Sequence, residues 1–254
     1  MFPPKIRSRL WALAYDMYED PTAQFFTEID LHHIMEAVHS RLGDRSLRIL
    51  ELGCGHGRLA IMLAKRGYNV VAVDSNEVAL GRARQHASHE GVSIDFQEAD
   101  VMTSSFGKYD VVIAVQLLQG KEKEVDAFIQ HVSGSILPRG LLVLEFRSRY
   151  IQTAICLKRG DFEGAVAVGK GDDRWLEPAD LGHMLESNGY EVIDVSGIGI
   201  VSGSKFDELG HFPNPSKLTE SDRAILQSLE LEFSSIKELS GCGRSILAIA
   251  QRSA

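Results

Sequence analysis

The chain contains an apolar run that ends in closely spaced glycines, Ile49-Leu50-Glu51-Leu52-Gly53-Cys54-Gly55-His56-Gly57. A second apolar run follows at residues 69–74 and ends in an acid, Asp74. A strand, a glycine turn, a helix and a second strand closed by an acid form a nucleoside-binding unit of α/β proteins. We therefore predict that this part of the chain binds a nucleoside cofactor.

The spacing of the glycines favours one nucleoside cofactor over another. A dinucleotide fingerprint reads G-x-G-x-x-G, whereas here Gly57 comes one residue early and Arg58 fills the expected position. Glu51 stands two residues before the first glycine and would repel a pyrophosphate docked at the helix N-terminus. A carboxylate there suits S-adenosylmethionine (SAM), which carries an ammonium and a sulfonium, and also ribose hydroxyls that need an acceptor. The loop is predicted to be a SAM site rather than an NAD site.

The composition is that of an ordinary globular protein and excludes several classes. With 254 residues, 44% hydrophobic and 24% charged, the chain can bury a sizeable core as one α/β domain. A formal net charge of -8 argues against a nucleic-acid partner, because a phosphate backbone demands a concentrated basic face. The three cysteines lack metal-ligand spacing, and their odd number fits a reducing compartment. With no transmembrane run and no signal-peptide core, we expect a cytoplasmic protein without a metal site.

Hydrophobic periodicity predicts alternating strands and helices in the middle of the chain. We expect strands at 47–52, 69–74, 92–97, 109–115 and 140–146, with helices that begin near residues 58, 76 and 122. Strands that are apolar throughout belong in a parallel sheet covered on both faces, with right-handed crossovers.

The two ends of the chain are expected to elaborate this sheet. Two helices, at 6–19 (ended by Pro21) and at 27–42, precede the first strand and are expected to form a cap. Beyond residue 147 we expect a helix at 148–158, a glycine-rich surface loop at 159–174, a helix at 178–189, a strand at 190–195, a loop at 202–217, a helix at 218–239 and a strand at 244–250.

The order of these parts resembles the class I SAM-dependent methyltransferases, specifically the small-molecule branch that includes ubiquinone and menaquinone biosynthesis enzymes. The resemblance spans nearly the whole chain and rests on five motifs in order, at residues 51–57, 73–74, 98–101, 109–112 and 137–140. His56 departs from the Thr or Ser that usually precedes the last glycine of the first motif.

The resemblance implies a Rossmann-like, doubly wound sheet of seven strands in the order 3-2-1-4-5-7-6, with the last strand antiparallel. It also implies a single domain over residues 1–254. Residues 1–45 would form the helical cap, 46–146 the cofactor-binding core, and 147–254 the substrate loop and the C-terminal part of the sheet.

Each site residue has an expected role. Gly53 and Gly55 would let the backbone approach the methionine part of SAM, and Glu51 would reach its ammonium. Asp74 would accept from both ribose hydroxyls, because two carboxylate oxygens can pair with a vicinal diol. The full set predicted to bind the cofactor is Tyr15, Glu51, Gly53, Cys54, Gly55, Gly57, Asp74, Ser75, Asp100, Val101, Val115 and Gln116.

Several of these positions also have a local structural interpretation. Asp100 would accept from the adenine amine, or it is a turn aspartate; the Val101 amide would donate to a ring nitrogen. Tyr15 resembles a tyrosine that the family lays over the cofactor, or it is a core residue. Arg147 would hold a substrate carboxylate or phosphate, or it pairs with a neighbouring helix. Cys54 is interpreted as small filler rather than a nucleophile.

The predicted activity is SAM-dependent methyl transfer to a small organic metabolite, with S-adenosylhomocysteine (SAH) as the second product. O-methylation of a phenol or related compound is preferred on the quinone-enzyme resemblance alone, and N- or C-methylation stays open. A sulfonium is already a good leaving group, so alignment supplies much of the acceleration. A base matters only for a protonated nucleophile; we assign none, although His32, His33, His183 and His211 are available.

Three other functions stay open. The chain could bind SAM as a regulator or scaffold without transferring methyl, or it could be a nucleotide-dependent oxidoreductase, against which Glu51 and the early Gly57 count. A nucleic-acid methyltransferase is disfavoured because residues 115–118 read Val-Gln-Leu-Leu where amino-methylating enzymes carry Asn or Asp, Pro, Pro and an aromatic residue. The oligomeric state is not predicted.

Overall fold

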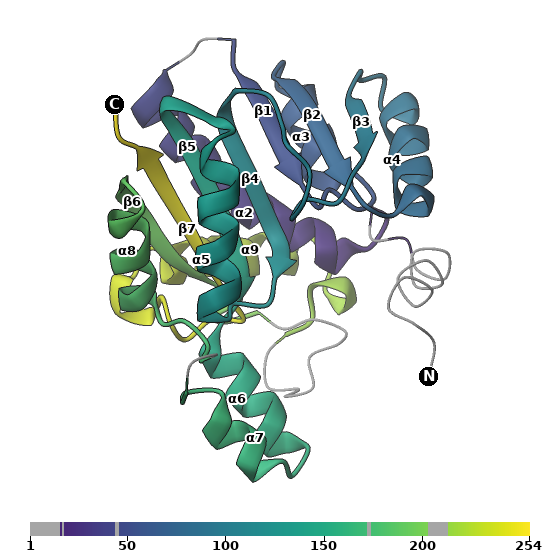
Figure 1. The fold of residues 1–254 in the computed structure, drawn as a ribbon. Coiled ribbons are helices and arrows are strands. Elements are labelled where there is room, and N and C mark those ends of the chain that lie inside the picture. Colours follow the sequence, from purple (N-terminus) through teal and green to yellow (C-terminus); the bar gives the residue numbers. More distant parts are fainter. Residues whose placement is uncertain (1–15, 17, 44–45, 172–173, 203–212) are drawn as a thin grey trace.

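Seven strands form one mixed sheet in the order β3-β2-β1-β4-β5-β7-β6 (Figure 1). The computed structural model describes residues 16, 18–43, 46–171, 174–202 and 213–254. The first five strands pair in parallel, and β7 runs antiparallel to both of its neighbours. The predicted strand order and the antiparallel closing strand are confirmed.

The elements of the described residues have the following bounds. The strands are β1 (Arg48–Leu52), β2 (Asn69–Asp74), β3 (Asp95–Glu98), β4 (Tyr109–Leu118), β5 (Ile136–Arg147), β6 (Tyr190–Ile198) and β7 (Ser245–Arg252). The helices are α2 (Pro21–Leu42), α3 (Arg58–Lys65), α4 (Glu77–His89), α5 (Glu122–Ser133), α6 (Arg149–Lys158), α7 (Phe162–Ala167), α8 (Pro178–Ser187) and α9 (Glu220–Ser234), with 3-10 turns at Pro215–Lys217 and Lys237–Leu239.

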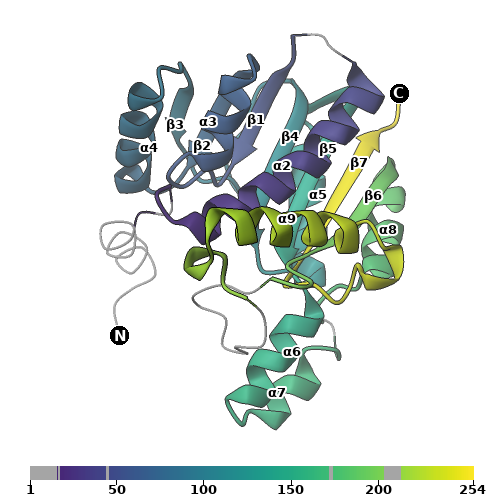
Figure 2. The ribbon, with the colours of Figure 1, turned by 180° about the vertical axis from the view of Figure 1, so that it is seen from behind.

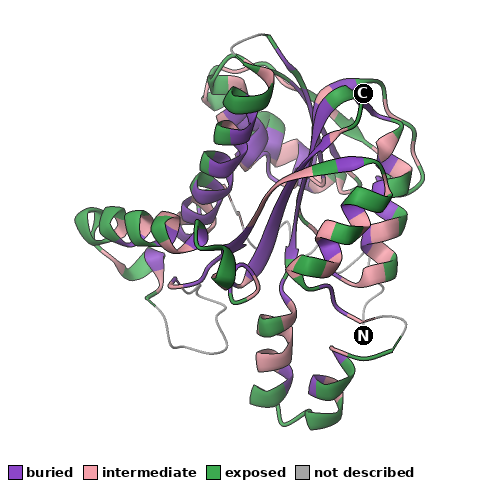
Figure 3. Cartoon of the chain, turned by 90° about the vertical axis from the view of Figure 1, so that its left-hand side faces the viewer, coloured by how far each residue is buried: buried purple, intermediate pink, exposed green. Residues whose placement is uncertain are grey.

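Helices cover both faces of the sheet because alternate strand residues point to opposite sides. Ile49 and Val111 belong to a core shared with α2, α3 and α9, which lie in front in Figure 2. Leu50 and Val112 belong to a second core shared with α5 and α8. Figure 3 shows the buried strands between these layers. This doubly covered sheet brings the carboxyl ends of β1, β2, β4 and β5 to one edge.

The helix before the sheet differs from the prediction in its start and its place. Asp20 caps α2 by accepting from the backbone N–H groups of Thr22 and Ala23, and Pro21 is its first residue. Proline is favoured at this position, where no intrahelical donor is needed. Pro21, expected to end a helix, therefore begins one. Phe25 and Phe26 are buried in the core, so α2 is a layer of the fold. Residues 6–15 and 17 of the other expected helix lie outside the described residues.

Several further boundaries differ from the prediction, among them the following three. The strand expected at 92–97 begins at Asp95, since Val92 still bonds the last turn of α4 (Val92 N to Ala87 O, 3.0 Å). The segment expected as a loop at 159–174 contains α7, which Asp161 caps through the Gly164 amide. The helix expected at 218–239 spans only Glu220–Ser234 and is followed by a separate 3-10 turn at Lys237–Leu239.

The helices α6 and α7 form a hairpin that projects from the body of the molecule (Figures 1 and 2). It packs around a buried cluster separate from the two cores of the sheet, made by Cys156, Ala165 and Val168 together with Trp175 from the segment before α8. Other apolar side chains of the hairpin are exposed, with Phe162 at 68%. The hairpin is therefore held by a small separate cluster, completed by Trp175 from the segment before α8.

We expect Glu230→Gln to destabilise the protein. Glu230, fully buried on α9, accepts from the Ile200 amide (2.7 Å), the Val201 amide (3.1 Å) and the Ser202 hydroxyl (2.7 Å). A glutamine amide can accept at one of its two ends only, which leaves a buried donor unpaired and lowers the free energy of unfolding by about 1–2 kcal/mol. Urea denaturation measures the loss. Glu232→Gln, exposed on the same helix, should change nothing, and an equal effect of both variants would contradict this role.

Candidate functional site

The glycine loop turns sharply at the carboxyl end of β1. Gly53 and Gly55 adopt positive φ values of 78° and 52°, and Gly57 caps α3. The Gly53 and Cys54 amides both donate to the Val73 carbonyl at 2.7 and 3.0 Å, which ties the loop to β2. If Gly55 carried a Cβ, no heavy atom of the described residues would lie within 4 Å of it. One side of the loop is thus open.

Asp74 fixes this loop from the end of β2. Its Oδ2 accepts from the Gly55 amide at 2.8 Å, and its Oδ1 accepts from the Asn76 amide at 2.8 Å. Each carboxylate oxygen can accept a second hydrogen bond. Asn76 rather than Ser75 caps α4, through the Val78 and Ala79 amides. Asp74 therefore organises the loop and keeps acceptor capacity for a ligand.

Glu51 is buried directly behind the loop, with 5% of its surface exposed. Its Oε2 makes no hydrogen bond to the described residues. Burial raises the pKa of its carboxyl to about 8, although Arg58 and the Ala60 amide oppose this. A buried acceptor without a donor is uncommon and calls for an explanation. A cationic ligand would supply the missing charge and donor.

The end of β4 bulges toward the glycine loop. Val115 pairs with Glu145 and Leu118 with Phe146, so the residues between them leave the register. Gln116 is exposed and adopts a φ of 55°, which costs a non-glycine residue free energy. Leu117 Cδ1 lies 2.8 Å from where a Cβ on Gly53 would stand, so a side chain there would collide. The predicted pair Val115 and Gln116 is thus next to the loop.

A cluster of buried charges lies between α2 and this edge of the sheet. Asp30 and Glu145 are almost wholly buried, and neither Asp30 Oδ1 nor either oxygen of Glu145 makes a hydrogen bond of normal geometry to the described residues. Burial and the charge of Glu145 raise the pKa of Asp30, while Arg244 and Arg58 act against this. Burial also raises the pKa of Glu145, opposed by Arg244. With Glu51, three carboxyl groups face two guanidinium groups, so acids are in excess.

The remaining predicted residues take different positions. Asp100 Oδ1 accepts from the Met102 amide at 2.9 Å, as a turn aspartate does, and Val101 is buried beside it. Ser75 is exposed. Arg147 ends β5 at the same edge and donates to Gln152 of α6 at 3.4 Å. Tyr15 lies outside the described residues.

Cys54 and the histidines have mostly structural surroundings. Burial raises the pKa of the Cys54 thiol well above its usual value, which favours an inert thiol. His33 joins α2 to α9 and β6, with Nε2 2.9 Å from Ser234 Oγ and Nδ1 3.5 Å from Asp194 Oδ2. His32 and His183 lie on the surface near glutamates. His211 lies outside the described residues.

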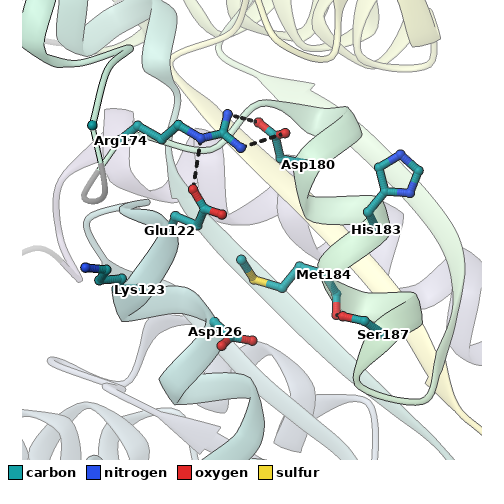
Figure 4. A pocket seen from close by; sticks show the side chains of 9 residues that line it. Glu122, Lys123, Asp126, Arg174, Asp180, His183, Met184 and Ser187 are labelled. Carbon is teal, nitrogen blue, oxygen red and sulfur yellow. Dashed lines mark hydrogen bonds and ion pairs between the residues drawn. The ribbon is translucent and has the colours of Figure 1, made fainter.

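A groove lies between α5 and α8 (Figure 4). Arg174 crosses it, with a bidentate contact to Asp180 (2.8 and 3.0 Å) and one to Glu122 (2.9 Å). Of the described residues predicted to bind cofactor or substrate, none lines it. The lining residues are Glu122, Lys123, Asp126, Gly171, Arg174, Asp180, His183, Met184 and Ser187. Because both carboxylates already neutralise Arg174, we interpret this arginine as a structural link between α5 and α8 rather than as a ligand-binding group.

Comparison with known proteins identifies the family. A family model described as a methyltransferase domain matches residues 49–140. The ubiquinone biosynthesis O-methyltransferase of Colwellia psychrerythraea is 30% identical over 170 residues, covering 65% of this chain and 69% of that protein. The chain belongs to the class I SAM-dependent methyltransferases.

Two more comparisons agree with this assignment. The ubiquinone biosynthesis O-methyltransferase of Sinorhizobium fredii is 26% identical over 216 residues, covering 75% of this chain and 83% of that protein. In fold, the methyltransferase resembles the crystal structure of magnesium protoporphyrin IX methyltransferase from Synechocystis PCC 6803 with bound SAH. The TM-score is 0.60 at 20% identity, over 94% of this chain and 89% of that chain.

The site of this methyltransferase suits its cofactor, SAM. Glu51 Oε2, which has no partner among the described residues, could accept from the ammonium of SAM. The second lone pairs of the Asp74 oxygens could accept from the ribose hydroxyls. The space beside Gly55 allows a ligand to come close to the backbone. No helix of the described residues has the length and apolarity that crossing a bilayer requires.

Four charged residues beside the candidate site, namely Asp30, Arg58, Glu145 and Arg244, are absent from the set predicted from the sequence. A signal was present for two of them. Glu145 interrupts the apolar run 141–146, and Asp30 stands between Ile29 and Leu31 on a helix. A lone acid inside an apolar element has to be paired or bound, which marks it as a site candidate.

Proposed function

We propose that this methyltransferase transfers the methyl group of SAM to a hydroxyl oxygen of a small organic metabolite. The observation that carries the cofactor side of this proposal is the buried Glu51 carboxyl behind the glycine loop, whose Oε2 has no hydrogen-bond partner among the described residues. The names of the two curated relatives support the acceptor side, since both are O-methyltransferases.

The cofactor side of the site has the following assignment. Glu51 receives the ammonium of SAM, and Gly53 and Gly55 allow its methionine part to approach the backbone. Asp74 accepts from the ribose hydroxyls through the lone pairs that Gly55 and Asn76 leave unused. Asp100 and Val101 contact the adenine. Completing the set are Tyr15, Cys54, Gly57, Ser75, Val115 and Gln116.

The acceptor side lies at the same edge of the sheet. Ligands of open α/β sheets bind beyond the carboxyl ends of the strands. Gln116 is exposed there beside the glycine loop, and Arg147 ends the neighbouring strand, where it would bind a substrate carboxylate or phosphate. SAM supplies an activated methyl group, and these residues of the chain place the acceptor oxygen in line with it.

Incubation of the protein with a metabolite extract and methyl-deuterated SAM tests this function. We expect mass spectrometry to show a product heavier by one labelled methyl, attached through oxygen. Tight SAM binding with no labelled product would favour a SAM-binding regulator or scaffold instead. Attachment through nitrogen or carbon would overturn the acceptor assignment, and incorporation into RNA or DNA would overturn the substrate class.

A further inference from the structure

The residues that lead into α2 are attached to the glycine loop. Asp16 Oδ1 lies 3.4 Å from Nδ1 of His56, between Gly55 and Gly57 of the loop. Asp16 Oδ2 lies 2.9 Å from His86 Nε2 and 3.5 Å from Arg82 Nη1, both on α4. One carboxylate therefore joins the chain before α2 to the loop and to α4.

Further contacts fasten this lead segment (residues 16 and 18–20) to α4. The Tyr18 ring stacks on His86, with centroids 4.2 Å apart and an interplanar angle of 13°. Its hydroxyl donates to Glu90 Oε1 at 2.9 Å. Burial and Glu90 raise the pKa of Tyr18 to about 12, so the phenol stays a donor at physiological pH. The lead segment is thus held against α4 by Tyr18, in addition to its contact with the glycine loop.

The charges around Asp16 favour an ionised carboxylate. Burial raises the pKa of Asp16, but the Tyr18 amide, His86 and His56 outweigh it and hold the pKa below its usual value. The His56 side chain is 1% exposed. Burial lowers the pKa of His56, as do Arg82, His86 and Arg58, while Asp16 opposes this. A neutral His56 with its proton on Nδ1 would donate toward Asp16.

We propose that Asp16 is a positioning residue for cofactor binding, which holds the glycine loop in its binding shape by fastening His56 to the lead segment and α4. This inference rests on the proposed function of the loop. Asp16 acts through His56, whose backbone lies between the two glycines that turn the loop. Its loss therefore weakens cofactor affinity and leaves methyl transfer at saturating SAM unchanged.

Asp16→Asn tests the proposal, with Glu19→Gln as the matched control from the exposed part of the lead segment. Calorimetry on the full chain should show Kd values for SAM and SAH about tenfold higher for Asp16→Asn, because the attraction between the Asp16 carboxylate and His56 is lost. Labelled product formed at saturating SAM should match the wild type. Hydrogen exchange at the amides of residues 54–57 should be faster in Asp16→Asn and unchanged in Glu19→Gln.

A double-mutant cycle with His56→Gln shows whether Asp16 acts through His56. The combined loss of affinity should be smaller than the product of the two single losses. Independent effects, or unchanged affinity in Asp16→Asn, would overturn the proposal while the proposed function stands. Failure of the wild type to bind SAM would instead overturn the proposed function. If Asp16→Asn does not fold, His56→Gln alone tests the same contact by exchange and affinity.

Discussion

Asp74→Ala is expected to abolish detectable methyl transfer at ordinary SAM concentrations. The variant loses both proposed hydrogen bonds to the ribose and the acceptor that orients the Gly55 amide. Two charge-assisted hydrogen bonds are worth about 3–5 kcal/mol together, so SAM affinity should fall by about 10²- to 10⁴-fold. Calorimetric titration with SAM and with SAH measures this loss.

The control for this variant is a nearby acid, Glu77. Glu77 lies in the first turn of α4 and forms an exposed pair with Arg84 at 2.7 Å. Exposed pairs contribute little to stability, so Glu77→Gln should bind SAM as the wild type does. Circular dichroism would establish that Asp74→Ala is folded. Retained SAM affinity in a folded Asp74→Ala protein would refute the ribose assignment.

Glu51→Gln is expected to weaken SAM binding by about 30- to 100-fold without loss of stability, as for one lost contact between buried opposite charges. Glutamine keeps the shape of the side chain and removes a buried carboxyl whose Oε2 has no donor among the described residues. The unliganded variant should therefore melt no earlier than the wild type. Methylthioadenosine, which lacks the amino acid part of SAM, should bind both proteins equally. Equal weakening of both ligands would contradict a contact between Glu51 and the ammonium.

The same residue predicts a pH dependence. Without cofactor the carboxyl of Glu51 has its pKa raised from 4.5 to about 8. Its contribution to stability is present below pH 4.5 and is lost as the pH rises through about 8, since the unfolded chain ionises first. A bound ammonium favours the ionised form. SAM binding should then release a proton between about pH 6 and 8, where Glu51 is still protonated in the free protein.

The ratio of wild-type to Glu51→Gln affinity measures this effect. The ammonium of free SAM titrates near pH 8, about the value of an α-amino group, but it does so equally for both proteins. The ratio should rise as the pH increases from about 6 toward 8. Calorimetry in buffers of different ionisation enthalpy counts the released proton. A ratio that does not change with pH would show that Glu51 is already ionised in the free protein.

The sheet and the loop could be predicted from the sequence because their signals are local. Apolar runs such as 69–74 define strands, and glycines behind a strand define a turn. The strand order 3-2-1-4-5-7-6 came from the family resemblance and is confirmed by the structure. The start of α2 is not predicted because Pro21 can end one helix or begin the next. The cap made by Asp20 shows that Pro21 begins α2.

The charged surroundings of the loop could not be predicted because they depend on distant parts of the chain. Asp30 lies on α2, and Arg244 is the residue before β7. They come close only when α2 packs on the sheet and β7 pairs within it. Asp16 likewise reaches His56 across many residues of sequence. Motif spacing identifies a turn, but the charges that surround it follow from tertiary packing.

The separate core of the α6–α7 hairpin has a consequence for how this methyltransferase can diverge. The cluster of Cys156, Ala165, Val168 and Trp175, rather than either core of the sheet, holds it together, and Trp175 joins that cluster from the segment before α8. Such a unit opens locally at a lower free energy than the whole domain unfolds. We therefore expect mutations in it to destabilise the parallel strands that carry the glycine loop less than mutations in the cores of the sheet do. Replacing this hairpin with one from another member of the family should therefore leave SAM binding at the glycine loop unchanged.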